Sequence, residues 1–400
     1  MDKDENRPEL RYNKSFHLYL TRVAFTSLAF SLYSIFIPIF SYIYSGSLLF
    51  TGLVLFAQYG VYSLTFLTGP VVDRVRNKRM VFFLSYSTIA AFSLFLAEMV
   101  HLNSLSPEIL IGVVIAIAFS DNFAWTTGHI VLPLLVDKSD FFRANGYAHL
   151  ISGTHAVGGF ALAGVILIFL GDLDSILMYS ATMAVASIIS LFIPLYARNR
   201  EAGGSGSLIE GWKYLAENHK PMILTAIYLS LVSFFGLAPA VLILYGTSGS
   251  SWYIILYASF MVGGSMAGPM LGILNLRKKV GAGIIASAMA YAILIMVSSY
   301  LFSFLPMEIP VWMGAGISFD TCIMLFNVYL QGTVKEEFLG RSASSLYTFR
   351  GISVSAGSLI IPVLILHFGI GITSIIPVVL IVPVSIAIIF AVKSIYKTSF

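Results

Sequence analysis

The sequence predicts an all-α membrane protein with twelve transmembrane helices in two six-helix bundles. Three observations lead to this fold class. Of the 400 residues, 58% are hydrophobic and 10% are charged, whereas a soluble chain carries roughly 25% charged residues. Apolar stretches of about 20 residues, enough to cross the hydrocarbon core, recur along the whole chain. Basic residues fall in alternate connections between these stretches, as expected for a multi-pass protein.

The composition also excludes several classes of protein. So few charges exclude a soluble enzyme, a disordered chain and a nucleic-acid binder, despite the formal net charge of +4. The single cysteine, Cys322, excludes a disulfide framework and a cysteine-based metal site. No Gly-x-x-x-x-Gly-Lys element is present, so ATP is not the direct energy source. We expect neither a metal ion nor a cofactor.

Twelve apolar stretches are bounded by charged residues or by Gly and Pro clusters. In the first half they cover residues 17–43, 48–72, 80–101, 109–135, 146–170 and 175–197. In the second half they cover residues 221–245, 251–275, 280–304, 310–333, 344–367 and 371–392. The first stretch follows a mixed-charge leader and lacks a small-residue cleavage site. We therefore interpret it as a span and not as a signal peptide.

The basic residues orient the chain. All of the 23 Lys and Arg residues except Arg22 and Arg350 fall in the leader, in the tail, or in connections that follow even-numbered spans. The other connections carry only the acidic residues Glu108, Asp172, Asp174 and Glu308. By the positive-inside rule, both termini are predicted to be cytoplasmic.

The two halves of the chain repeat. Matched pairs at an offset of 198 or 199 residues include Gly69 with Gly268, Asp121 with Asp320, Gly153 with Gly351, and Gly171 with Gly369. Six spans in each half give the copies a parallel topology. We expect an N-terminal bundle at residues 1–198, a cytoplasmic linker at 199–219 and a C-terminal bundle at 220–400.

The linker is predicted to contain a short amphipathic helix. Leu208, Trp212 and Leu215 fall at positions i, i+4 and i+7, on one face of a helix. A tryptophan-bearing amphipathic helix beside a span favours a place in the cytoplasmic interface. Docking of a partner is the alternative.

The connection between the second and third spans carries a signature. The segment Gly69-Pro-Val-Val-Asp-Arg-Val-Arg-Asn-Lys-Arg79 resembles the Gly-x-x-x-Asp-Arg-x-Gly-x-(Arg/Lys)-(Arg/Lys) motif of the major facilitator superfamily, with Arg76 in place of the usual Gly. The 6+6 repeat and the long central loop are similar to the same superfamily. Residues 135–164 and 211–215 resemble its drug- and siderophore-exporter branch. The resemblance implies a secondary transporter in the cell membrane, and we expect a monomer that is not an enzyme.

In that superfamily this loop latches the two halves together on the cytoplasmic side. The resemblance therefore implies a latch made of Gly69, Asp73, Arg74, Lys78 and Arg79. Because the second copy of the motif lacks the acid, the first half is expected to carry the latch. Glycine permits close helix contact, the acid can cap a helix, and the basic residues can contact lipid headgroups. Headgroup anchoring alone is the alternative.

Two acids lie near the middle of the predicted membrane. Asp121 is 13 residues from Glu108 and 16 from Asp137, or roughly 20 and 24 Å along a helix, and Asp320 has nearly the same depth. A charge there costs about 2.5–3.5 kcal/mol, so we expect a function rather than helix packing alone. The resemblance places both acids on the wall of a central cavity, where a carboxyl can exchange protons or bind a cation.

Other residues complete the predicted site. Arg22, eight residues or about 12 Å from Lys14, either snorkels to the headgroups or pairs in the cavity, and Arg350 is interpreted as structural. His155 is the histidine nearest the depth of Asp121 and is a candidate proton relay, with packing as the alternative. Close helix contacts are predicted at Gly153, Gly159, Gly164, Gly264 and Gly268.

We expect proton-coupled efflux of a hydrophobic or cationic small molecule. Phe160 stands where such exporters carry Pro, which argues against strict antiport. The alternative is a proton-coupled symporter that imports a small organic solute, which Arg22 beside Asp121 would suit. An intramembrane aspartyl protease fits poorly, because its Gly-x-Gly-Asp element is not matched by Gly314-Ala-Gly-Ile-Ser-Phe-Asp320.

Overall fold

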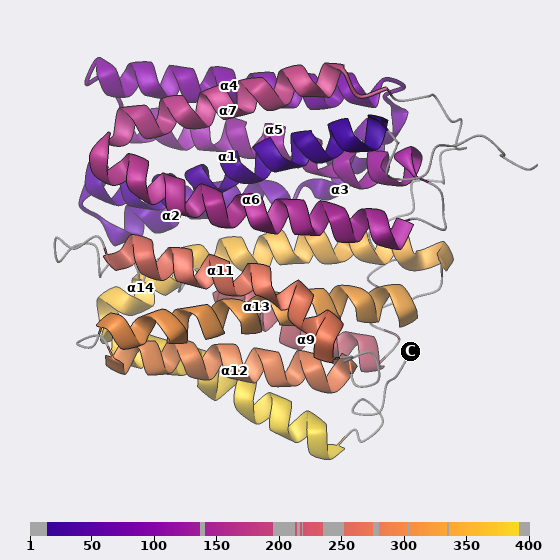
Figure 1. The fold of residues 1–400 in the computed structure, drawn as a ribbon. Coiled ribbons are helices and arrows are strands. Elements are labelled where there is room, and N and C mark those ends of the chain that lie inside the picture. The colour runs from indigo at the N-terminus through magenta and orange to yellow at the C-terminus, as the bar shows by residue number, and fades with distance from the viewer. Residues whose placement is uncertain are drawn as a thin grey trace, which may run out of the picture. The chain divides into compact units, whose positions relative to one another are not determined.

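A computed structural model describes residues 14–136, 141–194, 213, 217, 219–234, 252–274, 280–301, 305–333 and 336–391. Within these residues the fold is helical and contains no strand (Figure 1). The helices of the first half are α1 (Lys14–Ser45), α2 (Leu48–Tyr62), α3 (Thr65–Arg74), α4 (Lys78–His101), α5 (Pro107–Leu135), α6 (Phe141–Phe169) and α7 (Asp172–Leu191). Those of the second half are α9 (His219–Ser233), α11 (Trp252–Leu274), α12 (Val280–Leu301), α13 (Leu305–Thr333) and α14 (Glu336–Ala391).

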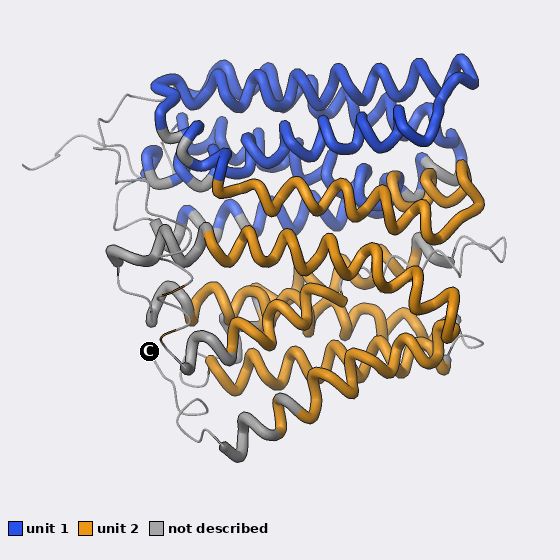
Figure 2. The backbone as a smooth tube through the Cα atoms, turned by 180° about the vertical axis from the view of Figure 1, so that it is seen from behind, with its two compact units in different colours: residues 1–36, 67–205 blue, residues 37–66, 206–400 orange. Residues whose placement is uncertain are grey.

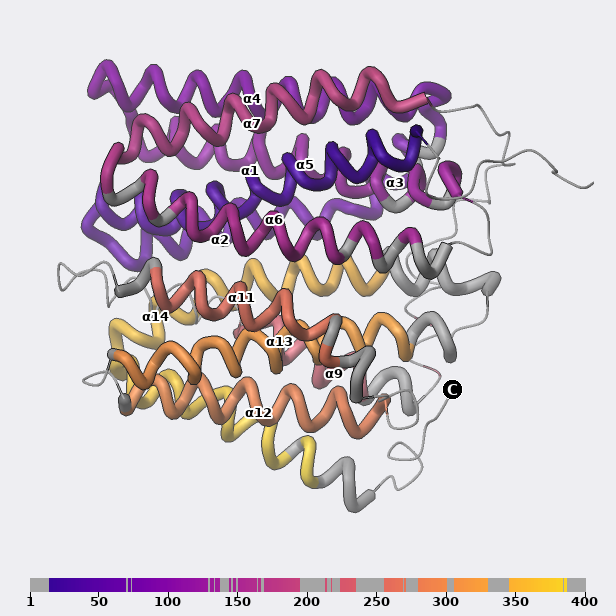
Figure 3. The backbone as a smooth tube through the Cα atoms, in the orientation of Figure 1, coloured from indigo at the N-terminus to yellow at the C-terminus, as the bar shows by residue number. Residues whose placement is uncertain are grey.

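Helices overlap each of the twelve predicted stretches, as the course of the chain in Figure 3 shows. The second stretch is divided between α2 and α3, and the last two are joined in α14. Eight described helical segments are long and apolar enough to cross a membrane, and shorter apolar segments lie in α6, α9 and α11. The chain is therefore a multi-span membrane protein, while the count of twelve spans and the cytoplasmic termini stay predictions.

The linker lies mostly outside the described residues. Lys213 and Glu217 are helical, and their side chains form an exposed ion pair at 3.8 Å with i, i+4 spacing. Such a pair stabilises a helix by a few tenths of a kcal/mol. This agrees with the helical part of the prediction and leaves its amphipathic face untested.

The sequence repeat reappears in the backbone. Gly171, before α7, has φ 89° and ψ −170°, and Gly369, inside α14, has φ 75° and ψ 167°. Side chains disfavour positive φ, so glycine is the residue that suits both turns. The same turn therefore joins equivalent spans in the two copies.

The repeat extends to helix packing. A Cβ on Gly159 of α6 would lie 2.8 Å from the Cβ of Ser31 on α1. A Cβ on Gly357 of α14, 198 residues later, would collide with the backbone carbonyl of Ser233 on α9. Each copy thus uses a glycine to bring its fifth span against its first.

The described helices form two compact units, coloured separately in Figure 2. Unit 1 consists of residues 1–36 and 67–205. Within it, α4 packs against α5 and α7. The hydroxyl of Ser180 donates to the carbonyl of Ala90 at 2.8 Å, and the hydroxyl of Ser187 donates to the carbonyl of Phe83 at 2.9 Å. These bonds satisfy polar groups that lipid could not, and they fix α7 on α4.

Unit 2 consists of residues 37–66 and 206–400, so it includes α2. In this unit α13 packs against α11 and α12, and α14 packs against α2, α9 and α12. The hydroxyl of Ser355 on α14 donates to the carbonyl of Phe56 on α2 at 2.9 Å. A Cβ on Gly52 would collide with Pro362, and one on Gly351 would collide with Ser63. The predicted domains divide the chain between its two sequence copies, whereas the compact units group helices by their contacts. Residues 37–66 therefore belong to the first copy in sequence and to unit 2 in the structure.

Candidate functional site

Asp320 and Arg350, the charged residues inside the predicted spans 310–333 and 344–367, belong to one cluster. Arg350 on α14 and Asp320 on α13 are half-buried, and their charges are close enough to interact. The hydroxyl of Tyr228 on α9 also lies close enough to interact with the guanidinium. Tyr347 and Tyr59 lie close enough to interact with the same charge. We call Asp320, Arg350, Tyr228, Tyr347 and Tyr59 the Asp320 cluster.

A glycine on α11 provides the space for the carboxylate of this cluster. A Cβ on Gly264 would collide with Oδ2 of Asp320. The next glycine of the predicted ridge, Gly268, lies against the flexible end of Met324, 3.3 Å from its Cε. The two glycines therefore differ: one sits against a charged group and the other against a side chain that can move.

Aromatic rings border the Asp320 cluster. The rings of Tyr228 and Phe326 are stacked with centroids 4.2 Å apart. Phe319, adjacent to Asp320 in sequence, lies 5.3 Å from the ring of Tyr291. The cluster thus combines both signs of charge and phenol groups with an apolar wall.

Unit 1 holds a second cluster around Arg22. The side chain is 5% exposed, and its Nη1 donates to the hydroxyl of Tyr86 on α4 at 2.5 Å. The guanidinium carbon lies 4.5 Å from the ring centroid of Tyr19 and 4.3 Å from that of Phe82. Burial among rings favours the pairing interpretation of Arg22 over snorkelling to the headgroups.

Asp121 approaches this cluster through Tyr86. The carboxylate, half-buried on α5, is close enough to interact with Tyr86 and with Tyr179 on α7. Tyr179 in turn lies 5.0 Å, ring to ring, from Tyr33 on α1. The structure therefore brings Arg22 and Asp121 to the same tyrosine, and we call Arg22, Tyr19, Phe82, Tyr86 and Asp121 the Arg22 cluster.

His155 makes a hydrogen-bond contact within its own helix. Its Nδ1 is 2.9 Å from the carbonyl of Ile151 on its own helix, α6. This contact agrees with the packing alternative and leaves the proton-relay role a prediction. Gly153 and Gly164 also lie on α6, and the contacts of Gly164 lie outside the described side chains.

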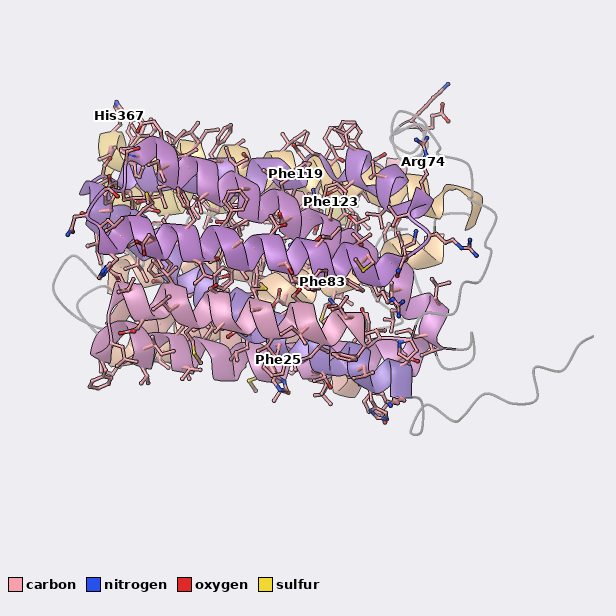
Figure 4. All side chains as sticks on the ribbon, turned by 90° about the horizontal axis from the view of Figure 1, so that it is seen from above. Phe25, Arg74, Phe83, Phe119, Phe123 and His367 are labelled. Atoms are coloured by element: carbon pink, nitrogen blue, oxygen red, sulfur yellow. The ribbon has the colours of Figure 1, made fainter. Side chains whose placement is uncertain are left out.

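In the predicted latch, Lys78 binds the end of the preceding helix. Its Nζ donates to the carbonyl of Val75 at 2.7 Å and to that of Val72. Arg74 and Arg79 are exposed, and Figure 4 shows Arg74 pointing away from the helices. A Cβ on Gly69 would meet no described atom within 4 Å, so the expected close helix contact is not found there. The side chain of Asp73 lies outside the described set.

Sequence reasoning missed several residues of these clusters. Tyr86 partners Arg22 and gives no signal in sequence, because aromatic residues are frequent in every span. Arg350 was interpreted as structural, and its place beside Asp320 depends on the packing of α13 and α14. The sequence signal that could have identified Arg350 was its position inside a predicted span, where a charge is costly. No group of three His, Cys, Asp or Glu side chains that could hold a metal occurs among the described residues.

Known proteins share this architecture. The family model described as Major Facilitator Superfamily matches residues 23–358. The solved structure of the nucleoside transporter NupG has a TM-score of 0.71 at 12% identity, covering 96% of this chain and 100% of that chain. A point mutant of NupG has a TM-score of 0.71 at 13% identity, covering 95% and 100%. Such low identity shows the fold alone. No curated protein matches the sequence, and nothing here supports the exporter branch.

Proposed function

The chain belongs to the major facilitator superfamily, and we propose that it couples the movement of a small polar organic solute to the movement of protons. The protein is a transporter and not an enzyme. We further propose that it acts by alternating access, as a monomer in the cell membrane. One observation carries the proposal: Asp320 on α13 and Arg350 on α14, two charges inside predicted spans, lie close enough in unit 2 for their charges to interact.

The chemistry follows from this juxtaposition. While Asp320 is ionised, its negative charge partly neutralises Arg350. When Asp320 takes up a proton, Arg350 loses that partner and is free to bind an electron-rich group of the solute. Release of the proton on the other side of the membrane restores the original interaction and weakens the hold on the solute. Proton and solute would then move together.

Tyr228 supports this role for Arg350. Its hydroxyl lies close enough to interact with the guanidinium, and a neutral hydroxyl can orient that group without neutralising its charge. Because the cluster presents a cation, an acid and phenol groups, it favours a solute with several polar groups. The fold is also that of a nucleoside transporter, and nucleosides are polar organic solutes of this general kind.

Efflux of a hydrophobic or cationic molecule is the second candidate. The stacked rings of Tyr228 and Phe326 favour it, because they offer an apolar wall close to a carboxylate. A cation would compete with the proton for Asp320. In that case proton and solute would move in opposite directions.

Proteoliposomes with an imposed pH gradient test the proposal. The wild type should accumulate the solute in the direction of proton flow, whereas an exporter should move it against proton flow. Asp320→Asn should abolish proton-driven accumulation while solute exchange across the membrane without a gradient persists. Asp174→Asn, at an exposed position on α7, is the matched control and should behave as wild type. Full proton-driven accumulation by Asp320→Asn would contradict the coupling role.

A further inference from the structure

The Arg22 cluster contains a buried cation whose hydrogen bonds are incomplete. Arg22 is 5% exposed, and its Nε is buried without an acceptor. Among the described residues, the bond from Nη1 to Tyr86 is the hydrogen bond that the guanidinium makes. A guanidinium has five N–H donors, so most of its capacity remains unused.

The rings around Arg22 orient the guanidinium. Tyr19 comes from the same helix, and Phe82 and Tyr86 come from one face of α4, where their rings are nearly parallel at 4°. Rings that contact the flat faces of a guanidinium leave its edge for in-plane acceptors. The edge that carries Nε is one to which a carboxylate binds with two parallel hydrogen bonds. The site is therefore preorganised for a planar anion.

The position of Arg22 calls for a counter-ion. It lies eight residues, or about 12 Å, from the start of α1. A buried unpaired charge is unfavourable, and contacts with rings recover only part of the lost hydration. Tyr86 is neutral, so it satisfies one donor and leaves the charge in place. The Nε edge of Arg22 therefore keeps a place for a negatively charged acceptor.

We propose that Arg22 binds the carboxylate of the transported solute, which makes the substrate a small organic acid or amino acid. The inference rests on the proposed transport function and names its substrate class. The solute carboxylate would occupy the Nε edge of Arg22, and Tyr86 would hold the opposite side of the guanidinium. Asp121, which interacts with the same tyrosine, would keep the anion from binding on the far side of Tyr86.

Binding to the purified protein tests this inference without a pH gradient. The probes are lactate, succinate, benzoate and alanine, each paired with its amide, together with inorganic phosphate. At least one acid should bind the wild type, and its amide should not. Arg22→Gln should weaken that binding about 30-fold or more, and Arg22→Lys, which keeps the charge but loses the planar fork, should also weaken it. Lys14→Gln, exposed on the same helix, is the control and should bind as wild type.

Several results would overturn the inference. They are binding of none of the acids, equal binding of acids and amides, binding of phosphate alone, or unchanged binding by Arg22→Gln. If Arg22→Gln does not fold, Arg22→Lys and Tyr86→Phe keep the test decisive, because each should lower the acid-to-amide preference. Unchanged acid binding by Arg22→Gln, together with loss of proton-driven accumulation by Asp320→Asn, would refute the substrate class and leave proton coupling standing.

Discussion

Gly264 is predicted to leave the space that the carboxylate of Asp320 occupies, and Gly264→Ala tests this directly. The new Cβ would collide with Oδ2 of Asp320, so either α11 or the carboxylate must move. In a helix interior, alanine is favoured over glycine by about 1 kcal/mol. Forcing a methyl group into a filled space costs about 1–3 kcal/mol. The collision should therefore cancel or exceed the gain in helix propensity.

Gly268→Ala is the matched control, one turn further along the same helix. The nearest atom there is Cε of Met324, at 3.3 Å, and a methionine tip can shift at little cost. We expect Gly268→Ala to be as stable as the wild type or slightly more stable. Gly264→Ala should be less stable than Gly268→Ala by about 1–3 kcal/mol if the carboxylate stays in place. If the carboxylate moves instead, stability is retained and proton-driven accumulation falls.

The assays are unfolding of the purified protein in detergent and proton-driven accumulation in proteoliposomes. A double-mutant cycle with Asp320→Ala sharpens them, because removal of the carboxylate removes the collision. In that background Gly264→Ala should be neutral or stabilising. Equal stability and equal proton coupling in the two glycine variants, together with additive effects in the cycle, would refute the reasoning.

Two further predictions concern packing and the loop after α3. Gly159→Ala should be less stable than Gly158→Ala by about 1–3 kcal/mol, because a Cβ on Gly159 meets Ser31 whereas one on Gly158 meets no described atom within 4 Å. Unfolding in detergent measures both variants, and equal effects would contradict the packing role of Gly159. Lys78→Met should cost about 1 kcal/mol because the carbonyl of Val75 loses the Lys78 donor and that of Val72 keeps only the backbone N–H of Val75. Exposed Arg76→Gln should be neutral in the same unfolding assay, and equal effects of the two changes would argue for headgroup anchoring alone.

The helical fold was predictable because membrane spans obey a simple constraint. An apolar stretch without partners for its backbone groups must form a helix, and each predicted stretch overlaps one. The division between α2 and α3 and the union of spans in α14 were not predictable, since breaks in apolar helices depend on local packing. The membership of α2 in unit 2 depends on contacts with residues about 300 positions away, which no local pattern contains.

The candidate site was predictable to the level of its acids and Arg22. Charge in a predicted span is rare and costly, so Asp121, Asp320 and Arg22 stand out in sequence. Tyr86 and Tyr228 did not, because a tyrosine in a span is common whether or not it binds an arginine. The glycine ridge was recognised from spacing alone, but spacing cannot tell that Gly264 faces a carboxylate and Gly268 a methionine.

The packing of α2 against α14 has a consequence for fragments of this chain. A cut in the linker separates the sequence copies and leaves the C-terminal fragment without α2. The exposed face of α14 would then present the backbone at Gly351 and the hydroxyl of Ser355, groups that α2 covers in the intact chain. Lipid offers these groups no substitute. Two separately produced fragments would therefore restore the protein only if α2 of the N-terminal fragment packs against α14 of the C-terminal fragment.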